Sequence, residues 1–154
     1  MRIFRFFAAA SLVSTFATIV IGGYVSAAGF GLACPDWPTC KGALVPDLSD
    51  PAVLTEWSHR TVAAVTGLLV VITLILAIVW HRQERRLLWP AAFAVVFLVP
   101  QVILGMLAIA SELEPIVVTS HLALAVATFA STWFLAIEAL RAGAGMAVEA
   151  APTG

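Results

Sequence analysis

The chain contains four long apolar segments separated by short polar ones. Each is about 20 residues or slightly longer, which is the length at which an α-helix crosses ~30 Å of hydrocarbon. The apolar residues run continuously and do not alternate with polar ones, as they would in a transmembrane barrel. The pattern predicts an all-α membrane protein, a four-helix bundle with spans at Phe6–Ala28, Thr61–Trp80, Leu87–Ala110 and Val117–Leu140.

The composition supports the same environment. Hydrophobic residues make up 62% of the 154 residues and charged residues only 11%, against about 25% charged residues in an ordinary soluble domain. A soluble domain of this size cannot bury that much apolar surface, and a disordered chain would be more polar. A net charge of -1 without a basic tract also argues against a nucleic-acid partner. We therefore expect the chain to lie in the lipid bilayer.

Charge placement predicts the orientation of the bundle. Six of the eight Lys and Arg residues fall before the first span, between the second and third, or after the fourth. By the positive-inside rule, both termini are expected in the cytoplasm of a multi-pass cell-membrane protein. Residues 1–142 would form the membrane domain and residues 143–154 a flexible cytoplasmic tail. A cleaved signal peptide ending near Ala27 is the alternative for the first span, although its apolar stretch is longer than a signal core.

The expected outer loop, Gly29–Thr55, contains both cysteines of the chain. Cys34 and Cys40 are separated by five residues, two of them prolines, and this short, stiff spacing can bring the sulfurs into bonding range. Disulfides persist on the non-cytoplasmic side. A structural disulfide and a redox-active pair both remain open, whereas two cysteines without a nearby histidine make a poor metal site.

Two histidines lie at the expected outer ends of parallel spans, His59 in the second and His121 in the fourth. At similar depth, their imidazoles could bind the two faces of a haem iron. Gly22 and Gly23 in the first span and Gly105 in the third lie at the same level and would leave room for a macrocycle. Close helix packing is the alternative for the glycines, and a buried neutral imidazole bonded to a backbone carbonyl is the alternative for each histidine.

Other polar residues accompany the histidines. Glu56 precedes His59 by three residues, so it shares a helix face and could move protons, orient the imidazole or help bind substrate; an exposed interfacial charge is the alternative. Arg60 could pair with a haem propionate or extend to the headgroups. Gln101 is expected to bond across helices, and His81 in the basic loop to be solvated.

Four motifs follow one another along the chain: GFGLACPDWPTCKG at 29–42, EWSHR at 56–60, QVILG at 101–105 and HLALA at 121–125. In these motifs the sequence resembles the haem A synthase family. The similarity runs from about Gly22 to Phe129, in order and with natural spacing. The combination is specific, although EWSHR alone would be weak.

This resemblance implies oxidation of the C8 methyl group of haem O to the formyl group of haem A, for cytochrome oxidase maturation. It implies that His59 and His121 are axial ligands of the iron, that Glu56 is catalytic, and that Cys34 and Cys40 are the family's outer-loop cysteine pair. Two other functions would use some of these residues. A non-catalytic bis-histidine b-type cytochrome would need only the histidines, and a membrane thiol oxidoreductase only the cysteines.

The family usually has two similar four-helix halves, one for substrate haem and one for a permanent haem b. The present sequence resembles one half, so its single histidine pair would serve alone or be duplicated by self-association. We therefore expect a homo-oligomer that replaces the second half. The expected cofactor is haem b, and the expected partners are haem O, haem O synthase and the cytochrome oxidase assembly machinery.

Overall fold

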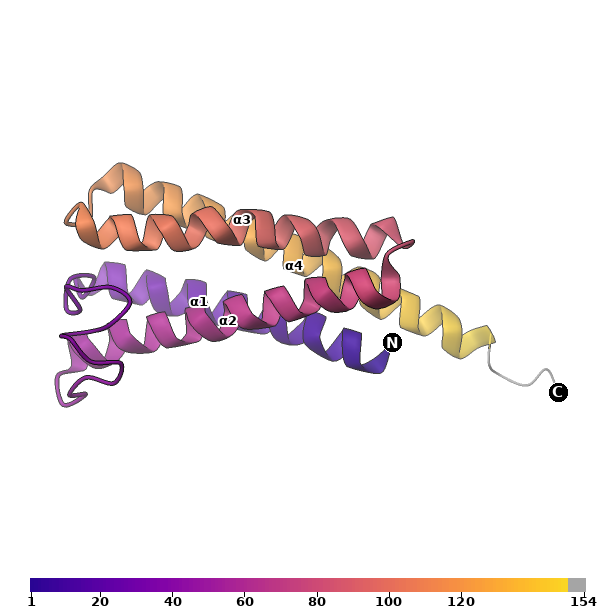
Figure 1. Cartoon of the computed structure of the whole chain (residues 1–154), viewed down its shortest axis with the longest axis horizontal. Coiled ribbons are helices and arrows are strands. Elements are labelled where there is room, and N and C mark those ends of the chain that lie inside the picture. Colours follow the sequence, from indigo (N-terminus) through magenta and orange to yellow (C-terminus); the bar gives the residue numbers. More distant parts are fainter. Residues whose placement is uncertain (150–154) are drawn as a thin grey trace.

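The computed structural model describes the backbone of residues 1–149 and the side chains of residues 1–142. Within this part the chain forms four helices and no strand, which confirms the predicted all-α fold. The helices are α1 (Arg2–Ala27), α2 (Pro51–His81), α3 (Arg85–Ala110) and α4 (Pro115–Glu149) (Figure 1).

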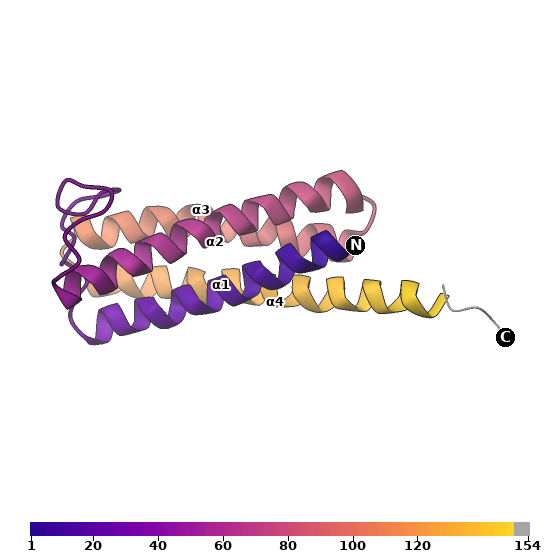
Figure 2. The same ribbon diagram turned by 90° about the horizontal axis from the view of Figure 1, so that it is seen from below.

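The helices run alternately up and down, and each packs against two neighbours: α1 and α3 both pack against α2 and α4. The N-terminus lies at the same end of the bundle as the α2–α3 turn, here called the terminal end (Figures 1 and 2). The α1–α2 loop and the α3–α4 turn lie at the opposite, loop end. All four helices are long and apolar enough to cross a membrane. The chain is therefore a multi-pass membrane protein, while its orientation remains a prediction.

Two helices extend beyond the predicted spans. Helix α2 begins at Pro51, ten residues before the expected start of its span at Thr61. The reason is local: the Asp50 carboxylate accepts a hydrogen bond from the Ala52 amide (2.9 Å), and proline suits the first position of a helix. Helix α4 continues to Glu149, beyond the expected end of its span. The remainder of the expected tail, residues 150–154, lies outside the described residues.

Buried apolar side chains pack the terminal end of the bundle. The four alanines among them let the membrane helices approach closely. His81 lies here too, and the expectation that it is solvated is wrong: its ring is buried 4.7 Å from that of Phe4, and Nδ1 lies 2.6 Å from the Glu84 carboxylate. His81 is the last residue of helix α2, and the helix holds its ring against that of Phe4. The core cluster contains Phe4, Ala8, Ala77, Leu87, Ala91, Leu135 and Ala139.

Hydroxyl groups join α1 to α2 in the middle of the bundle. Ser11 and Thr73 are 3.0 Å apart and buried, and Thr66 lies 2.6 Å from Ser14 and 2.9 Å from Thr18. Hydrocarbon offers these groups no water, so bonding across the interface satisfies them and fixes the two helices against each other.

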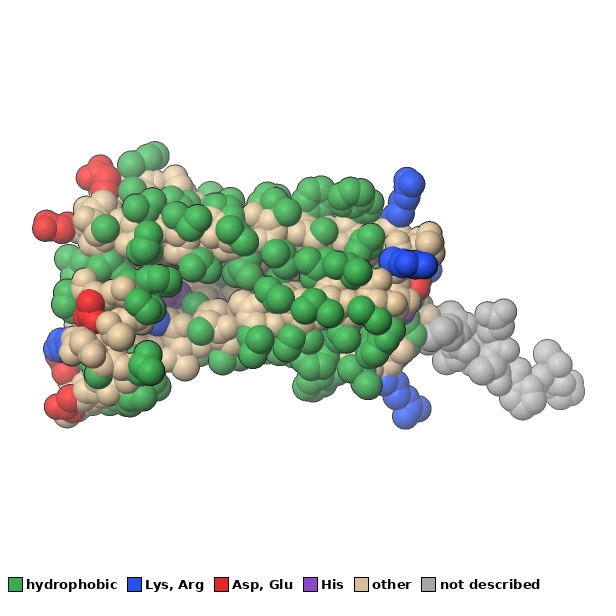
Figure 3. Space-filling view, in the orientation of Figure 1, with side chains coloured by type: hydrophobic (Ala, Val, Ile, Leu, Met, Phe, Trp, Pro, Cys, Tyr) green, Lys and Arg blue, Asp and Glu red, His purple; other side chains and the backbone are tan. Residues whose placement is uncertain are grey.

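The surface agrees with a membrane position. Apolar side chains cover the middle of the visible face, acidic side chains gather at the loop end, and basic side chains at the terminal end (Figure 3). Histidine atoms are visible in a hollow near the loop end.

Candidate functional site

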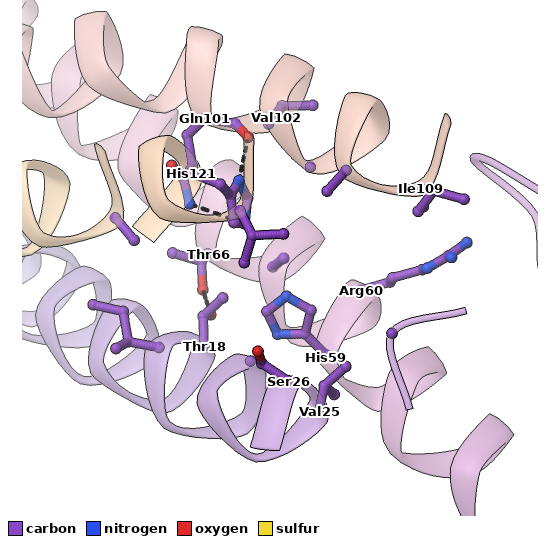
Figure 4. A pocket seen from close by; sticks show the side chains of 18 of the residues that line it. Thr18, Val25, Ser26, His59, Arg60, Thr66, Gln101, Val102, Ile109 and His121 are labelled. Atoms are coloured by element: carbon purple, nitrogen blue, oxygen red, sulfur yellow. Dashed lines mark hydrogen bonds between the residues drawn. The ribbon is translucent and has the colours of Figure 1, made fainter. Parts of the chain in front are cut away.

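A cavity of about 740 Å³ lies between the four helices on the loop side of the bundle. Its size suits a small-molecule ligand, since such sites range over about 300–1,000 Å³. Residues of all four helices line it, together with Trp37 and Pro38 of the α1–α2 loop. The walls are mainly apolar, with a few polar groups that include Thr18, His59, Thr66, Gln101 and His121 (Figure 4).

The structure brings both expected histidines to this cavity. His59 enters from α2 and His121 from α4, and their rings lie on different parts of the wall (Figure 4). The two histidines are 62 residues apart in the sequence. They reach the same cavity because α2 and α4 run in the same direction, so the start of each helix lies at the loop end of the bundle. Two imidazoles in one apolar cavity form a donor set that suits haem iron.

A glycine lies behind each imidazole. A Cβ added to Gly22 would lie 2.7 Å from Cε1 of His59, and a Cβ added to Gly105 would lie 3.1 Å from Cε1 of His121. Each ring therefore occupies space that any other residue would partly fill. Gly23, by contrast, has no atom within 4 Å of an added Cβ. Gly22 and Gly105 thus make direct contact with the candidate ligands, and Gly23 does not.

The two imidazoles differ in their hydrogen bonds. Nδ1 of His121 lies 2.9 Å from the Gln101 carbonyl oxygen, and Nε2 lies 3.2 Å from the Gln101 side-chain nitrogen. The predicted cross-helix bond of Gln101 is therefore confirmed. The carbonyl contact that was the alternative for a histidine is present at His121. It leaves a lone pair on the second ring nitrogen, Nε2, which faces the Gln101 amide. Among the described residues, Nδ1 of His59 is buried without a partner.

Cys34 and Cys40 form a disulfide with their Cα atoms 4.6 Å apart. Both cysteines are buried and pack against Val53 at the start of α2. The short cysteine loop is therefore attached directly to the helix that carries His59. This packing is typical of a structural disulfide.

Glu56 and Arg60 link this loop to α2 at the cavity. Glu56 is only 3% exposed, so the alternative of a water-exposed charge is wrong. One of its oxygens accepts from the Cys34 amide (2.9 Å), and the other pairs with Arg60 (2.5 Å). Arg60 also donates to the backbone carbonyls of Cys34, Asp36 and Thr39, contacts that neither expected role of this residue included.

The sequence did not single out Asp36, which organises the inside of the loop. Its carboxylate accepts from the Thr39 hydroxyl and from the amides of Lys41 and Gly42. The Thr39 hydrogen bond, followed by the Gly42 amide, lowers the pKa of Asp36 below its usual value. An aspartate between two prolines and six residues before a glycine was the available signal for such a turn.

The chain was compared with known proteins. Residues 5–153 match the family COX15-CtaA, described as "Cytochrome oxidase assembly protein". A protein named "Heme A synthase" from Geobacillus kaustophilus is 32% identical over 139 residues, which cover 88% of this chain and 43% of that protein. "Protoheme IX farnesyltransferase 1" from Natronomonas pharaonis is 38% identical over 122 residues, covering 79% of this chain and 25% of that protein.

A second protein named "Heme A synthase", from Bacillus licheniformis, is 34% identical over 126 residues, or 77% of this chain and 40% of that protein. The chain thus spans less than half the length of each of these three relatives. Since the family match extends over nearly all of the sequence, the chain belongs to the COX15-CtaA family, that of the haem A synthases.

Proposed function

We propose that this chain takes part in the oxidation of the C8 methyl group of haem O to the formyl group of haem A, in the cell membrane. The observation that carries the proposal is the placement of His59 and His121 on one cavity, each ring in contact with a glycine. Conversion of the methyl to the formyl group adds one oxygen atom and removes four electrons and four protons, counted with water as the oxygen source; haem iron, when bound, would relay these electrons to an external electron acceptor.

The cavity residues suit a haem for three reasons. The walls are mostly apolar, as a porphyrin requires; the buried Nδ1 of His59 lacks a hydrogen-bond partner among the described residues; and Gly22 and Gly105 keep side-chain atoms away from the imidazoles. His59 and His121 would hold the iron, and the Gln101 carbonyl would fix the ring of His121.

Glu56 is proposed as the proton-handling residue. Oxidation of a methyl group removes hydrogen, so a carboxylate at the cavity wall is placed to accept a proton. Arg60 would hold this carboxylate in position through their 2.5 Å ion pair. The same two residues bind the disulfide loop, which in this proposal covers the outer side of the cavity and limits access of water.

One histidine pair accommodates one haem, which we propose to be the substrate. A permanent haem b would then need a second pair, supplied by another copy of the chain. A segment similar to this chain also occurs in a protein named as a protohaem IX farnesyltransferase, which supports delivery of haem O by an enzyme of that class. Haem A would pass to cytochrome oxidase assembly.

The test is expression in a host that produces haem O, followed by extraction and mass analysis of the pigment. Haem A or a hydroxylated intermediate is expected with the native chain. Glu56→Ala is expected to keep the bound haem but to slow conversion by about a hundredfold or more. His59→Ala and His121→Ala are expected to lose the six-coordinate spectrum. Protohaem alone would instead support a b-type cytochrome, and the absence of any haem would contradict both functions.

A further inference from the structure

We infer that Gln101 is a positioning residue that covers the metal-binding nitrogen of His121, so that His121 binds iron only after the Gln101 amide moves aside. The inference rests on the proposed function, because it concerns how one of the same two histidines engages a haem. It follows from the hydrogen bonds of the His121 ring.

The contact with the Gln101 backbone determines the tautomer of His121. A carbonyl oxygen can only accept, so the Nδ1 atom 2.9 Å from it must carry the hydrogen. In a neutral imidazole, Nε2 then has a free lone pair. The group 3.2 Å from Nε2 must be the NH₂ of the Gln101 side chain, since the amide oxygen would face that lone pair unfavourably. Gln101 therefore binds both nitrogens of one ring.

This orientation leaves the amide poorly satisfied. With its NH₂ directed at His121, the Gln101 side-chain oxygen is buried and has no hydrogen-bond partner among the described residues. A buried polar atom without a partner is unfavourable in an apolar cavity. The Gln101 amide is thus held by one hydrogen bond of 3.2 Å, while its oxygen is unpaired. Little free energy is therefore lost when the amide turns away from His121.

The equivalent position on α1 does not cover His59. Gln101 lies four residues before Gly105, which contacts His121, and Thr18 lies four residues before Gly22, which contacts His59. The Thr18 hydroxyl donates to the Ser14 carbonyl and lies 2.9 Å from the Thr66 hydroxyl.

The two halves of the site therefore have the same layout but different polar groups. No side-chain amide bonds to His59 within the described part of the chain, and Nδ1 of His59 is buried without a partner there. The amide cover is therefore a feature of His121.

Chemical modification can detect the cover without any haem. Diethyl pyrocarbonate attacks an unprotonated imidazole nitrogen, and peptide mass spectrometry separates the His59 and His121 adducts. The full chain in detergent is used, with His59 as the internal reference for the His121 rate. Gln101→Leu is expected to raise the rate of His121 modification by about fivefold, which is the equilibrium factor of one ordinary hydrogen bond. The rate of His59 modification is expected to stay unchanged.

Val102→Ala is the matched control, since Val102 follows Gln101 in α3 and lines the same cavity without a polar contact. It is expected to leave both modification rates unchanged. Equal His121 rates in the native chain and Gln101→Leu, with unchanged helix content by circular dichroism, would overturn the inference. So would an acceleration of the same size in Val102→Ala.

Haemin, added to the same proteins, separates this inference from the proposed function. The native chain is expected to pass through a five-coordinate spectrum before the six-coordinate one, and Gln101→Leu is expected to shorten the second phase by about fivefold. If Gln101→Leu binds haemin as the native chain does, and the six-coordinate spectrum forms at the same rate in both, the role of Gln101 is contradicted and the proposed function is not. A native chain whose haemin spectrum does not depend on His59 or His121 would contradict the proposed function.

Discussion

Gly22 and Gly23 are neighbours in α1 with the same intrinsic helix propensity, but only Gly22 faces a candidate ligand. An added Cβ at Gly22 would come within 2.7 Å of the His59 ring, whereas the same atom at Gly23 would meet nothing within 4 Å. The pair therefore separates the effect of glycine on the helix from its effect on the site. No other difference in chemistry needs to be considered.

Gly22→Ala is expected to displace the His59 ring and to abolish the six-coordinate haemin spectrum. The overlap corresponds to an overpacked site, which costs about 1–3 kcal/mol. Gly23→Ala is the control and should bind haemin normally, with a gain in stability of about 0.5–1 kcal/mol from helix propensity. Absorption titration checks the first effect and thermal unfolding the second. Equal haemin spectra for the two variants would show that the His59 contact does not position the ring.

The sequence could predict this level of detail only in part. Depth along the helices brought the histidines and glycines to one level, because rise per residue is constant. The rotation of α1, which directs Gly22 and not Gly23 at His59, depends on packing against α2. The contacts of Gln101 with His121 depend likewise on the relative rotation of α3 and α4, which spacing within one helix does not define.

At the scale of elements, α2 performs two tasks along its length. Its central part is apolar, and the sequence pattern predicted it. Its first turns, from Pro51 to Arg60, are outside the apolar run and anchor the α1–α2 loop through Glu56, Trp57 and Arg60. Hydrophobicity could not identify these turns as helix, although Asp50 followed by Pro51 was a readable start signal. The partners of Arg60 are loop carbonyls, which no side-chain pattern reveals.

Arg60→Gln tests this anchoring. Removing the guanidinium leaves the buried Glu56 carboxylate without its charge partner and frees three loop carbonyls. The expected destabilisation is about 3–5 kcal/mol, as for one partner of a buried ion pair, with faster reduction of Cys34–Cys40 by dithiothreitol. Thermal unfolding and thiol labelling measure the two effects.

Arg141→Gln is the matched control. Arg141 pairs with Glu138 at 2.7 Å, but its side chain is 71% exposed, and exposed pairs contribute about 0–1 kcal/mol. Its removal should leave disulfide reduction unchanged. If the Cys34–Cys40 disulfide is reduced at the native rate in both variants, Arg60 does not hold the loop.

At the scale of the whole molecule, the described chain contains one histidine pair on one cavity, and it spans less than half the length of its haem A synthase relatives. A function that needs a substrate haem and a second haem at once would require two such bundles. Copies of this chain can supply them, which motivates the proposed homo-oligomer. Its exposed apolar surfaces are available to lipid and to a second bundle alike.

Crosslinking in membranes before solubilisation tests the oligomer. The expected product is a species of two or more chains that carries the conversion activity, with mass measured by native mass spectrometry. In mixtures of His59→Ala and native chains, the loss of activity should exceed the fraction of His59→Ala chains if the copies act together. A fully active species at the mass of one chain, 16.3 kDa plus haem, would contradict self-association.

The packed terminal end also affects how often the site can be used. Side chains around Phe4, Ala77 and Leu135 fill the bundle at the terminal end, so the proposed haem between His59 and His121 would have no passage through that end. Under the proposed function, substrate and product would enter and leave on the loop side or sideways into the lipid. Product would then have to leave before the next substrate entered, so an acceptor that removes the product is expected to raise the turnover rate.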